Sequence, residues 1–341
     1  MRLSDFDYVD TIFIFGQNPG SNHPRMLATL EKAKQRGARI VSINPLNETG
    51  LRSFANPQTL AGLRGQGTDL MLDDVVVIGS EAGLGGGGIA VEAVSGSVTV
   101  TNSRFQSNTA KGGDGGGVRI NDTGGSVTLD SVVLDSNESL TGEGGGVYSL
   151  SPTQPALLDG VTALLNRAAQ EGGGIRVGAM SVDLLGIFAD ENGALAAGGM
   201  WAEATSGDVT ASLVTLHGNV ATNGYGGVRM VSQNGDVFAD RVEASDNSSG
   251  FAAGFSASAP NGGNEIERST IDGNSSKVEG AALRVSSAQT ATIVDTTVTG
   301  NRSPVAAGVM FDNVLDAAVS RSTLSGNAAH AIDGGGLYAL N

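Results

Sequence analysis

The sequence predicts a mainly β protein, in which a small α/β segment over residues 1–70 precedes a right-handed parallel β-helix of about ten coils over residues 74–341. Two observations lead to this prediction. Composition changes abruptly near residue 70, and two sequence markers then recur with one shared period. Residues 1–70 hold 8 Lys and Arg, 6 Asp and Glu, and 7 of the 52 glycines. The remaining residues hold 12 Lys and Arg against 29 Asp and Glu, a net charge of −17, and 45 glycines.

The overall composition excludes several classes of protein. The chain has no Cys, so it offers no disulfide, thiolate metal site or cysteine nucleophile. A net charge of −15 argues against a nucleic-acid partner, which needs a basic surface. We expect no membrane span, because no apolar run approaches the roughly 18 residues required. The start, MRLSDFDYVD, lacks the basic and apolar stretches of a secretory signal.

The first segment reads as one β-α-β unit. A short apolar run at Asp10–Phe15 predicts a buried strand, and Arg39–Ile43 predicts a second. Between them, Pro24 opens a stretch with apolar residues at helical spacing that ends near Gly37. A strand, a Gly-containing loop, a helix and a parallel strand form half of a nucleotide-binding sheet, and the loop could cradle a pyrophosphate. A tight turn without a ligand explains the same residues.

This segment resembles the molybdopterin oxidoreductase family in its formate-dehydrogenase-like branch, through DFDYVDTIFIFGQNPGSNHPRMLATLEKAKQRGARIVSINPLNETGLRSFANPQ. The resemblance covers about residues 4–70 and implies contacts to molybdopterin guanine dinucleotide. It assigns these contacts to Gly16, Asn18, Pro19, Gly20, Asn22, His23, Asn44, Pro45 and Glu48. Many relatives have Asp-Pro-Arg where this chain has Asn44-Pro45-Leu46, so the charged contacts of those relatives are lost.

The catalytic parts of that family lie on both sides of this unit, and neither part is present in the sequence. Without Cys, the chain also cannot ligate molybdenum or iron–sulfur clusters through thiolates. We therefore expect no molybdenum catalysis and no bound cofactor. Enzymatic activity of any kind is not expected from the chain as it stands.

Two markers define the repeat. A glycine run followed by an apolar residue recurs every 25–29 residues, with the apolar residue at Ile89, Val118, Val147, Ile175, Met200, Val228, Phe255, Leu283, Val309 and Leu337. An Asn after a short apolar segment recurs every 26–29 residues, at Asn108, Asn137, Asn166, Asn192, Asn219, Asn247, Asn274, Asn301 and Asn327. Two markers with one period indicate a solenoid.

Three short strand-like runs per period predict a right-handed parallel β-helix. Glycine permits positive φ and close passage of neighbouring coils. We expect each Asn to adopt the left-handed conformation at a turn and to hydrogen-bond to the Asn of adjacent coils. Residues Val75–Gly83 have the shape of Val132–Leu140, with Glu81 at the Asn position, so the repeat is predicted to start near residue 74.

The repeats GG-x-[ILV] and [FL]-x-x-N resemble those of bacterial polymorphic outer membrane proteins and related pectin-lyase-like β-helices, most closely at Phe105-Gln106-Ser107-Asn108. Such proteins are typically exported adhesins or autotransporter passengers, and others are polysaccharide lyases or hydrolases. The resemblance implies an extracellular or outer-membrane location. The N-terminal segment instead implies the cytoplasm, so the location stays open.

One candidate binding face follows from strand alternation. The residue after each inward apolar residue points outward. This outward stripe comprises Ala90, Arg119, Tyr148, Arg176, Trp201, Arg229, Ser256, Arg284, Met310 and Tyr338. Its functional interpretation is a groove for an acidic glycan or another cell-surface ligand, with Trp201 as platform and Arg176 and Arg229 as clamps. Glu203 could hold either Arg in place. The alternative is a ladder that only stabilises the sheet.

A weaker candidate is a Ca²⁺ site. Asp208, Asp236 and Glu265 each stand one residue before a predicted second strand, so they should stack and could share a cation. The alternative is a solvated acidic turn. His23, His217 and His330 lie too far apart to share a metal.

Four functional hypotheses remain: a non-catalytic surface rod, a polysaccharide lyase or hydrolase, a fragment of a molybdopterin-dependent oxidoreductase, and a chimeric gene in which the junction near residue 70 joins two unrelated sequences. The ligand, the export route and the oligomeric state are not defined by the sequence.

Overall fold

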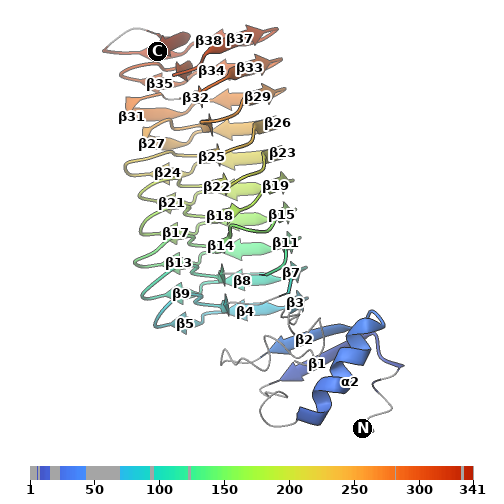
Figure 1. Cartoon of the computed structure of the whole chain (residues 1–341). Helices are drawn as coiled ribbons and strands as arrows, with labels where there is room; N and C mark the ends of the chain where they lie inside the picture. The colour runs from blue at the N-terminus through green and yellow to red at the C-terminus, as the bar shows by residue number, and fades with distance from the viewer. Residues whose placement is uncertain are drawn as a thin grey trace.

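The computed structural model describes residues 6, 8–15, 24–43, 70–92, 96–121, 124–280, 282–331 and 334–340. It contains a two-stranded parallel sheet with one helix, followed by a right-handed parallel β-solenoid (Figure 1). In the first part, β1 (Thr11–Phe15) pairs with β2 (Arg39–Ile43), and α2 (Pro24–Gln35) lies between them in the chain. Leu30 and Ala33 of the helix pack with Ile12 and Ile14 of β1. The predicted order of these elements is confirmed.

Three sheets run the length of the solenoid. The first sheet follows the glycine run, and its strands are β6 (Ile89–Glu92), β10 (Val118–Asn121), β14 (Val147–Ser151), β18 (Ile175–Ala179), β22 (Met200–Ala204), β25 (Val228–Ser232), β28 (Phe255–Ala259), β32 (Leu283–Ser287), β36 (Val309–Asp312) and β40 (Leu337–Leu340). Ten strands enclose nine intervals, so the solenoid makes about nine turns, slightly fewer than the ten coils predicted.

The second sheet has two legs that meet at a bend. The first leg consists of β3 (Leu70–Asp73), β7 (Val98–Thr101), β11 (Val127–Asp130), β15 (Ala156–Asp159), β19 (Val182–Leu185), β23 (Val209–His217), β26 (Val237–Ser245), β29 (Asn264–Glu267), β33 (Thr290–Val294) and β37 (Asp316–Ser320). The second leg consists of β4 (Val76–Ile78), β8 (Arg104–Gln106), β12 (Val133–Asp135), β16 (Thr162–Leu164), β20 (Phe188–Asp190), the ends of β23 and β26, β30 (Thr270–Asp272), β34 (Thr297–Thr299) and β38 (Thr323–Ser325). Pairing of β3 with β7 means that the solenoid strands begin at Leu70, before the predicted start at residue 74.

The third sheet consists of short strands after each Asn, a fourth strand per turn that the sequence did not indicate. These strands are β5 (Glu81–Ala82), β9 (Thr109–Ala110), β13 (Glu138–Ser139), β17 (Arg167–Ala168), β21 (Gly193–Ala194), β24 (Val220–Ala221), β27 (Ser248–Phe251), β31 (Ser275–Glu279), β35 (Arg302–Ser303) and β39 (Ala328–Ala329). Glu81 pairs with Thr109 in this sheet. The Asn position of the first turn is therefore Ser80, and the prediction of Glu81 is wrong by one residue.

The predicted asparagine ladder is confirmed. Each side-chain Nδ2 donates to the Oδ1 of the next Asn over 2.8–3.0 Å, from Asn108 to Asn327. The same Oδ1 atoms accept a backbone N–H at each step, for example that of Asn166 at Asn192. The left-handed residue is the one before the Asn, such as Ser107 with φ of 53°, and not the Asn itself. The amide must point into the core to reach its neighbours, and the preceding residue makes the turn.

The turns of the solenoid stack closely enough to require glycine. A Cβ added at Gly116 would lie 2.3 Å from the carbonyl oxygen of Gly145 on the next turn, far inside van der Waals contact. The register is also confirmed: Val118 pairs with Ile89 on one side and Val147 on the other. The inward side chains form one continuous core, in which Phe105 and Phe255 are completely buried.

Candidate functional sites

The outward stripe has the predicted register along the first sheet. Arg119, Tyr148, Arg176, Trp201 and Arg229 pair in succession. Their exposure differs from the prediction, because the stripe is half-covered and two of its members, Ser256 and Met310, are buried at 4% and 2% exposure. The turns beside the sheet cover these positions: Gly280 approaches the Met310 sulfur, for example.

Carboxylates neutralise three of the four stripe arginines. Arg176 Nε lies 3.1 Å from Glu143 Oε2 and 3.6 Å from Glu171 Oε2, and Arg176 Nη2 lies 3.1 Å from Glu203 Oε2. Glu203 thus holds one of the two arginines named for it. Arg119 pairs with Glu92, and Arg284 pairs with Glu279 and Asp312, in the last case over 2.5 Å.

The carboxylates around Arg176 are themselves perturbed. Burial raises the pKa of Glu143, while Arg176 opposes the rise. Burial also raises the pKa of Glu171, and the charge of Glu143 raises it further. Both glutamates lie in the turn that leads into the first sheet. In three successive turns, an acidic residue immediately precedes the three glycines of the marker: Asp114, Glu143 and Glu171. This regular spacing of acidic residues is the sequence signal that predicts them.

Arg229 is different from the other stripe arginines. Its guanidinium carbon lies 4.3 Å from the centroid of the Trp201 ring and 4.7 Å from that of Tyr225. Among the described residues, no carboxylate forms a salt bridge with it, and its buried Nε has no hydrogen-bond acceptor. The buried Nε1 of Trp201 on the adjacent strand also lacks an acceptor. The guanidinium carbon of Arg176, on the strand at the other side of Trp201, lies 5.1 Å from the centroid of the same indole ring. Trp201 therefore separates two guanidinium groups instead of presenting a bare platform.

The proposed Ca²⁺ residues do not form one column. Asp208 and Asp236 occupy equivalent places, and Asp208 Oδ1 accepts the backbone N–H of Asp236 over 2.8 Å. Glu265, however, pairs with Phe238 inside β29, so the prediction that it stands before its strand is wrong. β29 opens with the polar Asn264 at an inward position, where the other turns have an apolar residue, so the sequence pattern places the start of the strand too late. Within the described ranges, no three His, Asp or Glu side chains are placed to hold a metal ion.

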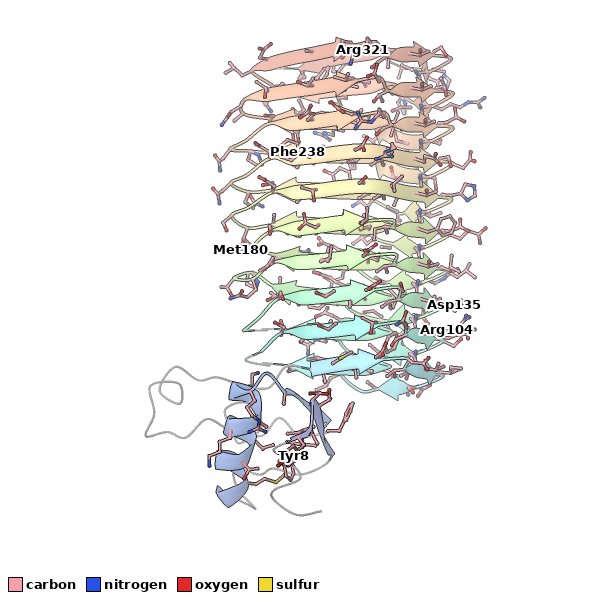
Figure 2. The ribbon with its side chains drawn as sticks, turned by 90° about the vertical axis from the view of Figure 1, so that its right-hand side faces the viewer. Tyr8, Arg104, Asp135, Met180, Phe238 and Arg321 are labelled. Atoms are coloured by element: carbon pink, nitrogen blue, oxygen red, sulfur yellow. The ribbon has the colours of Figure 1, made fainter. Side chains whose placement is uncertain are left out.

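A groove that the sequence did not indicate lies on the second sheet, with a volume of about 520 Å³. Figure 2 shows Phe238, one of its residues, on the broad face of the solenoid partway along its length. The groove crosses β15, β19, β23, β26 and β29 and is lined by Leu157, Asp183, Leu184, Leu185, Thr210, Ala211, Ser212, Phe238, Ala239, Asp240, Glu265 and Glu267. No single repeat contains this combination, which explains why a periodicity analysis overlooks it.

The nine residues that the molybdopterin oxidoreductase resemblance assigns to the cofactor, from Gly16 to Glu48, lie outside the described residues. Their role stays a prediction. In the part of the chain that is described, no helix is both long enough and apolar enough to span a bilayer.

Known proteins match a short part of the chain. It is 51% identical over 67 residues to proteins named uncharacterized oxidoreductase from Mycobacterium bovis and Mycobacterium tuberculosis, which is 20% of this chain and 9% of theirs. It is 50% identical over 56 residues to Protein YdeP of Escherichia coli, 16% of this chain and 7% of that protein. The chain thus spans less than a tenth of the length of these relatives. No family model matches the chain, and no solved structure matches it significantly.

Proposed function

We propose that the solenoid is a non-catalytic binding rod of an extracellular or cell-surface protein, and that it binds an acidic glycan at Arg229. The β-solenoid architecture supports a role as a long, rigid surface. Arg119, Arg176 and Arg284 are engaged by carboxylates of the same chain, so they are poor receptors for a second anion. Arg229 has no salt-bridge partner among the described residues, and the only carboxylate whose pKa it is shown to lower, Glu171, already pairs with Arg176.

The observation that carries this proposal is the pair of unsatisfied donors. Buried polar groups in folded proteins are nearly always hydrogen-bonded, and an unpartnered one costs about 1–3 kcal/mol. Two such groups on neighbouring strands, Arg229 Nε and Trp201 Nε1, point to an acceptor that joins them on binding. A carboxylate or sulfate oxygen of a glycan has this chemistry.

Calorimetry of the full chain with oligogalacturonate and with heparin fragments tests this proposal. We expect Arg229→Gln to abolish binding, and Trp201→Phe, which keeps a ring but removes the donor, to weaken it about tenfold, equivalent to about 1.4 kcal/mol. Arg284→Gln is the matched control and should bind as the wild type does. Equal binding by Arg229→Gln and the wild type would refute this function.

A second proposal concerns the N-terminal segment: it is a remnant of a molybdopterin-dependent oxidoreductase. The short matches to proteins with oxidoreductase names support it. We infer that they fall on residues 4–70, because a match of 67 residues fits this span. The segment should not retain the dinucleotide, since ligand sites bury most of a ligand's surface and one β-α-β unit covers one side. Recovery of stoichiometric pterin from purified protein would contradict this expectation.

The junction near residue 70 can be examined directly. Our proposal is that it joins two unrelated genes. Sequencing of genomic DNA and transcript across codons 60–80 decides the matter: a break in either read supports the chimera, and a continuous read in both establishes a true fusion.

A further inference from the structure

The groove on the second sheet has a chemical character unlike that of the stripe. Three apolar side chains on it remain accessible to solvent: Leu157 is 39% exposed, Leu185 is 40% exposed and Phe238 is 37% exposed. They are interspersed with carboxylates and hydroxyls, and none of the residues that line the groove is basic. An exposed aromatic ring among leucines, hydroxyls and carboxylates offers a stacking face for a ligand ring.

The exposed groove residues belong to two outward columns of the sheet, the second of which begins outside the groove at Asp159. One column runs Leu157, Asp183, Thr210, Phe238, Glu265 from strand to strand, and the other runs Asp159, Leu185, Ser212, Asp240, Glu267. With strands about 4.8 Å apart, Asp183 and Glu265 stand about 14 Å from each other, with Thr210 and Phe238 between them. The first column is therefore a straight track along the rod axis.

The charges in the two columns are balanced differently. Asp240 pairs with Arg268 at 2.7 Å and with Arg241 at 3.0 Å, and Arg268 also pairs with Glu267. Asp183 accepts a hydrogen bond from Thr210, and neither Asp183 nor Glu265 has a salt-bridge partner among the described residues. The uncompensated negative charge thus lies in the first column, on both sides of the aromatic ring.

The surroundings of Glu265 disfavour its charged form. Burial raises its pKa, and the hydrogen bond and charge of Glu267 raise it further. A cation placed at Glu265 would relieve this repulsion, whereas an anion would increase it. The groove therefore selects against the acidic glycans proposed for the stripe.

The floor of the groove also restricts the class of ligand. Its strands are hydrogen-bonded to the strands of the turns on both sides, so their backbone N–H and C=O groups are engaged within the sheet. A peptide cannot add to this face as a further strand, because β-augmentation requires a free sheet edge. Recognition must proceed through side chains: ring faces, hydroxyls and charges.

We propose that this groove binds an oligosaccharide of amino sugars, whose protonated amines pair with Asp183 and Glu265 while one sugar ring stacks on Phe238. Hydroxyls of the ligand would bond to Thr210, Ser212 and Asp240. The site is separate from Arg229 and does not depend on the proposal made for it.

The test uses the full chain and three probes just below neutral pH, because stronger acid would protonate Glu265, whose pKa is raised. A glucosamine hexamer carries both rings and amines, an N-acetylglucosamine hexamer carries the rings without the charge, and hexalysine carries the charge without the rings. We expect calorimetric binding of the glucosamine hexamer, and binding of the other two at least tenfold weaker. Equal binding of hexalysine would overturn the proposal in favour of a cationic peptide, and equal binding of the N-acetylated hexamer would overturn the role of the carboxylates. No binding of the glucosamine hexamer would overturn it entirely.

Variants localise the binding. Asp183→Asn and Glu265→Gln should each weaken it about two- to fivefold, as expected for solvent-accessible ion pairs, and Phe238→Ala about tenfold. These side chains point outward, so the fold should be retained, which circular dichroism checks. Phe188→Ala and Glu243→Gln, on the other leg of the second sheet, are matched controls and should bind normally. Unchanged affinity in all three groove variants would refute the assignment.

Discussion

The asparagine ladder and the outward stripe are both columns of side chains in register from turn to turn, but they are built differently. The ladder repeats one residue nine times, is buried at every Asn but the last, and satisfies its hydrogen bonds from within. The stripe mixes Arg, Tyr, Trp, Ser and Met, and each Arg has a different environment. A uniform column indicates a structural role, because every turn imposes the same requirement. An irregular column can vary from turn to turn, so functional differences such as that of Arg229 arise there.

The largest effect is expected from interrupting the ladder at its centre. Asn192 accepts from Asn166 and donates to Ala163 O and Asn219 Oδ1. Asn192→Ala leaves several buried groups unpaired, and should lower the free energy of unfolding by about 3–5 kcal/mol. Urea denaturation measures this loss.

Asn327 provides the control for the ladder. It is only partly buried and ends the chain of amides described in the structure. Asn327→Ala should therefore destabilise the protein by about 1 kcal/mol. If the two substitutions had equal effects, the ladder would not be a cooperative buried network.

A smaller effect is expected in the stripe. Arg176→Met leaves Glu143, Glu171 and Glu203 without their shared cation, and should cost about 2 kcal/mol at neutral pH. Arg229→Met removes no ion pair and should cost about 1 kcal/mol through lost ring contacts. Thermal unfolding of both variants makes the comparison.

The pH dependence of the Arg176→Met defect has a definite sign. Burial raises the pKa of Glu143 and Glu171 above the ordinary 4.5, so the folded state binds protons more readily than the unfolded state. Stability therefore falls as pH rises from 4.5 through the raised pKa values. The charge of Arg176 lowers both pKa values, so the loss of Arg176 raises them further and enlarges this fall in stability. The defect should shrink in acid, and a defect that is constant with pH would mean that packing, not charge, is responsible.

His217 should have a still smaller effect. Its Nδ1 lies 2.8 Å from Asp190 Oδ1, and this hydrogen bond raises its pKa above 6.5, with further support from the charges of Asp190 and Asp246. The stabilisation is complete below pH 6.5 and is lost as pH rises through the folded-state pKa. Because the side chain is 47% exposed, solvent screening limits the contribution to about 0.3 kcal/mol. His217→Gln should flatten this part of the stability curve, and an unchanged curve would contradict the assignment.

Removal of residues 1–69, which leaves β3 intact, should have the smallest effect on the solenoid. Each turn contacts its neighbours, so stability is nearly a sum of local terms. A chain of residues 70–341 should keep its β-type circular dichroism and lose less stability than His217→Gln does. An unfolded or aggregated product would show that the solenoid depends on the N-terminal segment.

Periodicity explains which features could be predicted from the sequence. The apolar positions, the ladder and the stripe register recur every turn, so ten imperfect copies of one signal reinforce each other. Errors arose where a repeat position holds an unusual residue type. Ser80 replaces Asn at the first turn, so Glu81 was misplaced by one residue, and the polar Asn264 fills an inward position of β29, so Glu265 was assigned to the wrong column. The prediction that the Asn itself adopts the left-handed conformation was also wrong. Asn favours this conformation in isolation, but the ladder overrides the preference, and the residue before the Asn adopts it.

The sequence by itself determined the solenoid, its inward column and its asparagine ladder, because these require the same residue type at a fixed spacing and depend on contacts between equivalent positions. Only the tertiary structure decided which charges meet. Arg176 reaches Glu143, 33 residues away, and the groove combines side chains from five turns that share no motif. Such pairings depend on where each turn directs its side chains across the rod, and the period of the repeat carries no information about that direction.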